Sequence, residues 1–123
     1  MTIREAIERL DTLRPNMAPE EQKVRWLSEV DGQVWNELIL KHEDAPFRLF
    51  NGYDSETDPE TELLVPYPYD ALYIHYLSAQ VDLLNQEIGK YNNSAEMYNQ
   101  GLKSYGDYYT GMHLPIRSGH WKV

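Results

Sequence analysis

The stretch that decides the fold is residues 74–109, IHYLSAQVDLLNQEIGKYNNSAEMYNQGLKSYGDYY, in which apolar or aromatic residues recur at alternating steps of three and four. Such steps place side chains on one face of an α-helix. The stripe predicts one continuous helix over residues 69–110, which would be about 60 Å long at the usual rise per residue. Its members are Ile74, Leu77, Val81, Leu84, Ile88, Tyr91, Ala95, Tyr98, Leu102, Tyr105 and Tyr109.

A helix of that length cannot be covered along its whole stripe by a chain of 123 residues, because a compact domain of this size has a radius of gyration of only about 14 Å. Part of the stripe therefore needs another partner. We interpret the tyrosines as packing residues whose rings are buried while their hydroxyls stay near water. Small and amide-bearing neighbours favour helix packing within and between subunits. The predicted interaction residues on this helix are Tyr91, Tyr98, Leu102, Tyr105 and Tyr109.

Two shorter helices are predicted before this stretch. Thr2 and Glu5 have the spacing of a capping box, and apolar residues at helical steps predict a helix over residues 3–13. Pro19 suits the first turn of a second helix over residues 19–41, in which Gly32 is a weak point. The fold class expected is mainly α, with two short N-terminal helices and one very long C-terminal helix.

The segment between these helices, residues 42–68, loses the helical period and is rich in turn residues and acids. Asn51-Gly52 between apolar residues is typical of a hairpin turn, and ELLVP at residues 62–66 is the other strand-like run. An irregular segment or a small two-stranded β element is therefore expected.

The acids of this segment include three that are spaced like the first ligands of a calcium-binding EF-hand loop, namely Asp54, Glu56 and Asp58. Pro59 stands where that loop needs glycine, and Val65 stands where it needs a bidentate glutamate. A solvated acidic loop is the expected structure.

The tail, residues 111–123, is locally basic although the whole chain has a net charge of −9. Arg117, Trp121 and Lys122 are its predicted interaction residues, because a basic tail on an acidic protein finds its complement on an acidic surface of a neighbouring copy. The segment 43–62 is the expected receiver.

The composition argues against several classes of function. The chain has no cysteine and no run of 18 apolar residues, and its negative charge repels nucleic-acid phosphates and anionic lipid. Its histidines lack metal-site spacing, and Asp70 and Asp82 are interpreted as solvated carboxylates. The sequence predicts one cytoplasmic domain that is not an enzyme, with no cofactor, no metal, and neither nucleic acid nor membrane as partner.

Three stretches in this order, TIREAIERL, EEQKVRWLSEVDGQVWNELI and ELLVPYPYDALYIHYLSAQVDLLNQEIGKYNNS, resemble the small head–tail connector, or adaptor, proteins of tailed phages and of prophages in Gram-positive bacteria. The likeness covers roughly residues 2–94 and rests on helical patterns, including Asn85 to Glu87 after the Tyr- and Leu-rich run. It implies a non-enzymatic virion protein that forms a homo-oligomeric ring and contacts portal or other neck or tail proteins. The helix expected here continues beyond the family's usual end, and the acidic insert is unusual.

The alternative hypothesis is a small cytoplasmic regulatory or protein-binding module. Such a module would use the tyrosine-rich half of the long helix to hold one other protein. Neighbouring genes would separate the two hypotheses.

Overall fold

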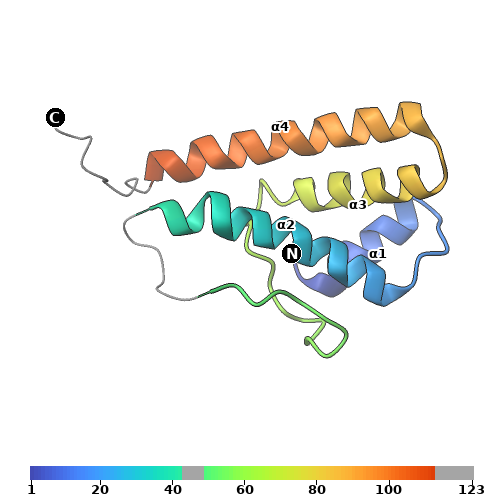
Figure 1. Ribbon diagram of the computed structural model, residues 1–123, viewed down its shortest axis with the longest axis horizontal. Helices are drawn as coiled ribbons and strands as arrows, with labels where there is room; N and C mark the ends of the chain where they lie inside the picture. Colours follow the sequence, from blue (N-terminus) through green and yellow to red (C-terminus); the bar gives the residue numbers. More distant parts are fainter. Residues whose placement is uncertain (43–48, 113–123) are drawn as a thin grey trace, which may run out of the picture.

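The computed structural model describes residues 1–42 and 49–112. The regular secondary structure in these ranges is all helical, with no strand; an isolated β-bridge joins Thr2 to Glu62. The elements in chain order are α1 (Ile3–Leu13), α2 (Glu20–Glu37), the short 3-10 helix η1 (Ile39–Lys41), α3 (Ala71–Leu84) and α4 (Ile88–Met112), all shown in Figure 1.

Helix α1 begins at the predicted capping box and covers the predicted range. Thr2 Oγ1 accepts a hydrogen bond from the Glu5 amide at 3.1 Å, and Glu5 Oε1 accepts one from the Thr2 amide at 2.9 Å. These reciprocal bonds satisfy amides that the first helical turn leaves free. The apolar face of α1 is then buried through Ile3, Ala6 and Leu10.

Helix α2 ends earlier than the sequence predicts. Gly32 lies inside the helix, whereas the α-helical backbone stops at Glu37 and continues as η1 after Leu38. The expected single helix over residues 19–41 is therefore an α-helix followed by one 3-10 turn. The α-helix ends before Leu38 and is not interrupted at Gly32.

The prediction of one long C-terminal helix is wrong. The helix stops at Leu84, a new one starts at Ile88, and α4 runs back antiparallel along α3 (Figure 1). A hairpin of two helices lets the apolar stripe cover itself, which a straight helix in a domain of this size could not do.

Residues 85–87 make the reversal with a Schellman motif. Gln86 has the left-handed backbone conformation, with φ of 59°. Its amide donates to the Leu83 carbonyl at 3.1 Å, and the Glu87 amide donates to the Asp82 carbonyl at 2.9 Å. These two bonds end the helix. They require a residue in the left-handed conformation, which is usually glycine or asparagine. A glutamine here gives no sequence signal for the stop.

Folding back turns most of the stripe into the interior of the hairpin. Leu77 and Val81 of α3 and Tyr98 and Tyr105 of α4 are all buried. The small residues beside the stripe serve this packing: a Cβ placed on Gly101 would lie 3.1 Å from Leu72 Cβ. Of the close helix packing expected within and between subunits, the part within one chain is found here.

The segment between η1 and α3 is irregular where it is described, so the expected two-stranded element is wrong. Gly52 does turn the chain, with φ of 84°, but no strand flanks it among residues 49–70. Residues 47 and 48 of the expected hairpin lie outside the described ranges. The segment is tied to α1 instead, through bonds from the Ile3 amide to the Thr61 carbonyl and from the Arg4 amide to the Pro59 carbonyl.

Candidate functional site

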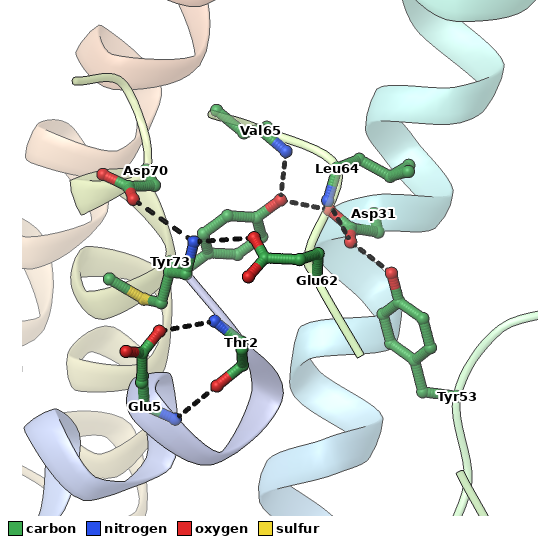
Figure 2. Close-up of polar contacts among 10 residues, drawn as sticks. Thr2, Glu5, Asp31, Tyr53, Glu62, Leu64, Val65, Asp70 and Tyr73 are labelled. Atoms are coloured by element: carbon green, nitrogen blue, oxygen red, sulfur yellow. Dashed lines mark hydrogen bonds and ion pairs between the residues drawn. The ribbon is translucent and has the colours of Figure 1, made fainter. Parts of the chain in front are cut away.

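A buried carboxylate, Asp31 of α2, joins three parts of the fold (Figure 2). It accepts hydrogen bonds from the hydroxyls of Tyr53 and Tyr73, each at 2.5 Å, and from the Leu64 amide at 3.0 Å. The Tyr73 hydroxyl in turn accepts from the Val65 amide at 2.8 Å. The Asp31 cluster therefore connects α2, the irregular segment and α3.

Burial raises the pKa of Asp31, while the bonds from Tyr53, Tyr73 and Leu64 act in the opposite direction. Burial, followed by the charge of Asp31, also raises the pKa of both Tyr53 and Tyr73. The phenols thus stay protonated and act as donors. With its oxygens occupied by internal donors, Asp31 fits a structural role better than proton transfer to a substrate.

A second buried carboxylate, Asp82 of α3, fixes the hairpin to α1. It accepts from Arg14 Nε at 3.0 Å and from Ser94 Oγ at 3.1 Å. The expectation that Asp82 is solvated is wrong, because its side chain is fully buried. Across the described residues, every buried side-chain nitrogen or oxygen has a hydrogen-bond partner.

The predicted interaction residues of the long helix are placed mostly inside the subunit. Tyr98 is buried, donates its hydroxyl hydrogen to Gln33 Oε1 at 2.8 Å, and contacts the ring of Tyr76 at a tilt of 58°, with ring centroids 4.9 Å apart. Tyr105 is buried against Tyr69, with centroids 5.6 Å apart.

Burial also raises the pKa of Tyr105 to about 12. Tyr91, Leu102 and Tyr109 are half-buried, and the ring of Tyr109 contacts that of His42. The tail residues Arg117, Trp121 and Lys122 lie outside the described residues.

Exposed apolar side chains that the sequence did not reveal lie beside the α3–α4 turn and in the α1–α2 loop. Exposed fractions are 98% for Met17, 63% for Leu84, 56% for Ile88 and 46% for Leu83. We call these four residues the end patch. Met17 and Leu84 line the same open cleft of about 590 Å³, together with Val81. The patch exists because the stripe is cut at the turn, which leaves Leu84 and Ile88 without a facing helix.

A second surface is a groove of about 520 Å³ between α1, the start of α2 and the turn at residues 54–59. The apolar side chains of Ile3, Ile7 and Val24 line it. Its acidic lining residues are Glu8, Asp11, Glu20, Glu21 and Asp54. We call this surface the acidic groove.

The acidic side chains of the groove differ in whether a cation forms an ion pair with them. Lys23 Nζ lies 2.7 Å from Asp11 Oδ1, and the pKa of Asp11 is lowered because its bonds from Lys23 and Asn16 outweigh the opposing effect of burial. Within the described residues, Glu8, Glu20 and Glu21 take part in no ion pair. The groove therefore offers an apolar interior beside uncompensated negative charge.

The acids of the irregular segment mainly hold turns. Asp54 Oδ1 accepts from the Glu56 amide at 2.9 Å, and Asp58 Oδ1 accepts from the Glu60 amide at the same distance. In the part of the chain that the structure describes, no group of three or more His, Asp or Glu side chains could hold a metal ion. Across the same part, no helix is long and apolar enough to cross a membrane.

No protein-family model, no curated protein and no solved structure matches the chain. Among the described residues, the end patch exposes apolar side chains and the acidic groove is lined by carboxylates.

Proposed function

We propose that this protein is a non-enzymatic structural subunit that assembles with copies of itself, as a connector between the head and tail of a phage or prophage virion. The observation that carries the proposal is the end patch, in which Met17 is 98% exposed and Leu84 and Ile88 are more than half exposed. Apolar side chains gathered at one end of a small domain favour burial against another protein surface.

The internal polar network supports a structural role. The two fully buried carboxylates, Asp31 and Asp82, are both bonded to groups on other elements of the same chain. They hold helices in place, as a subunit with fixed contact surfaces requires. The acidic groove and the end patch differ in chemistry, so a contact that uses different surfaces on the two copies is favoured. Contacts of this kind generate rings when the rotation closes.

The test is the oligomeric mass of the full chain in light scattering over a range of concentrations, with electron microscopy of the same samples. We expect assemblies of the wild type, and a lower mass for the double variant Met17→Asp, Leu84→Asp, because charges at the contact must be desolvated. Leu49→Asp is the matched control, since Leu49 is 78% exposed and lies outside the patch. A wild type that stays at 14.5 kDa at every concentration would overturn self-assembly.

Genome context tests the virion part of the proposal. Neighbouring portal, terminase or capsid genes are expected. A lone gene among metabolic genes, together with a monomeric protein, would favour the alternative of a small regulatory or binding module that uses the tyrosine-rich helix to hold one other protein. The proposed location follows the same test: the bacterial cytoplasm during assembly, and then the virion.

A further inference from the structure

We propose that the acidic groove of one copy receives the C-terminal segment, residues 113–123, of a second copy. This inference rests on the proposed self-assembly and specifies one of its contacts. Its starting point is the combination of an apolar groove interior with carboxylates that no cation of the described chain neutralises.

The groove needs an occupant with both apolar and cationic side chains. Ile3, Ile7 and Val24 form the apolar floor of the groove and are 2%, 9% and 6% exposed, so they offer such a segment only a narrow apolar contact. Glu20 and Glu21, at the start of α2, would face its cations. The one arginine that lines the groove, Arg4, is engaged with Glu60.

The C-terminal segment has this composition. Residues 108–123 are the chain's longest run without an acid, and the end of that run carries Arg117 and Lys122 beside Ile116 and Trp121. Charge complementarity thus selects this segment in a protein whose net charge is −9. The sequence points to residues 43–62 as the receiver of the tail. Residues 54–59 of that stretch form one wall of the acidic groove, and we infer that the groove as a whole is the receiver.

Within one chain, the backbone after α4 is too short to bring the Cα atom of Arg117 to the groove. The rings of His42 and Tyr109 lie 4.9 Å apart, so the end of α4 lies beside the end of η1, whereas the groove is at the start of α2. Helix α2 has 18 residues, which separates its two ends by about 27 Å.

Arg117 follows Met112, the last residue of α4, by only five positions. Five extended residues span about 17 Å at most. A neighbouring copy has no such restriction, and each copy can then give one tail and accept another. This contact joins the tail of one copy to the groove of the next, so it can repeat around a closed ring or along an open chain.

Charge reversal on the full chain tests the contact. One variant carries Glu20→Lys and Glu21→Lys, and the other carries Arg117→Glu and Lys122→Glu. Each alone should lower the mean mass in light scattering by roughly twofold or more, because every copy loses a head-to-tail link. Mixing the two should restore the mass, since each tail then meets a groove of opposite charge. The control is Glu37→Lys with Glu96→Lys, which changes the net charge equally at exposed positions outside the groove.

Each result decides between distinct outcomes. If both reversed variants keep the wild-type mass while the Met17 and Leu84 variant loses it, the tail contact is overturned and the proposed assembly stands. If the mass falls but mixing does not restore it, docking between copies is overturned. If the wild type is monomeric throughout, self-assembly and the tail contact both fail.

Cross-linking gives a second measurement, because the chain has no cysteine of its own. Chains with Ser55→Cys, on the groove wall, are mixed with chains carrying Ser118→Cys under oxidising conditions. A covalent heterodimer on a non-reducing gel is expected. A chain with both substitutions that links only to itself would show docking within one copy and would overturn the proposal.

Discussion

Asp31 shows how single side chains set the arrangement of this molecule. Its two carboxylate oxygens accept from Tyr53, Tyr73 and the Leu64 amide, which belong to the irregular segment and to α3. The irregular segment forms no strand in its described part, and these bonds attach it to α2. Removing either phenol should therefore loosen the segment.

The two tyrosines should differ in how much they matter. Tyr73→Phe leaves both the Val65 amide and Asp31 Oδ1 short of a partner in a buried site, and we expect it to lower the free energy of unfolding by about 3 kcal/mol. Tyr53→Phe removes one donor from a half-exposed ring and should cost about 1.5 kcal/mol. Urea unfolding followed by circular dichroism measures both changes in unfolding free energy. Equal changes would contradict the second hydrogen bond of Tyr73, which its hydroxyl accepts from the Val65 amide.

The raised pKa of Asp31 predicts a pH dependence. Because its pKa is higher in the folded than in the unfolded chain, folding favours the protonated carboxyl. The contribution of this group to stability is then fully present below about pH 3.9 and is lost as the pH rises through the folded pKa. The difference in unfolding free energy between wild type and Asp31→Asn should shrink between acid and neutral pH. A difference that grows with pH would contradict this sign.

At the scale of elements, the turn between α3 and α4 carries the fold. Gln86 adopts a left-handed conformation that costs a residue with a Cβ roughly 1 kcal/mol. Gln86→Gly should relieve this cost and stabilise the protein by about that amount. The matched control is Gln100→Gly in the middle of α4, which should destabilise by about 1 kcal/mol. Thermal unfolding shifts of the same sign would mean that residues 85–87 do not form this turn.

The packing of α4 on its neighbours gives another prediction at this scale. Tyr98→Asp places a charge where a buried ring contacts Tyr76 and bonds Gln33, and it should lower stability by about 3 kcal/mol or more. Gln100→Asp, two residues further along on an exposed face, should change stability little. Chemical denaturation of both variants is the measurement, and similar midpoints would contradict the inward orientation of the tyrosines.

At the scale of the whole molecule, only one of the two proposed contacts should weaken when salt is added. Charge pairs between a tail and an acidic groove weaken as the screening length falls below about 10 Å, whereas apolar contact at the end patch does not. Deleting residues 113–123 should leave the helical content unchanged and make the remaining assembly insensitive to added salt. Light scattering of both chains across a salt series tests this. If the mass of the truncated chain still falls with salt, the salt-sensitive contact is not the one made by the tail.

The sequence alone determined the features that depend on neighbouring residues. Thr2 and Glu5 mark the start of α1 because a capping box is complete within one helical turn. The spacing of apolar residues likewise indicated that residues 74–109 are mostly helical and that their aromatic rings pack. These signals are local, and tertiary contacts do not reverse them.

Only the tertiary structure decided that the 74–109 stripe folds back on itself. The spacing of three and four runs unbroken through residues 85–87, and Gln86 replaces the glycine that would have marked the stop. The choice between one helix and two therefore depends on where apolar area can be buried, which is a property of the whole chain. The burial of Asp31 and Asp82 and the exposure of the end patch follow from that reversal and from the packing around it, because the same residue type is solvated or enclosed according to what lies opposite it.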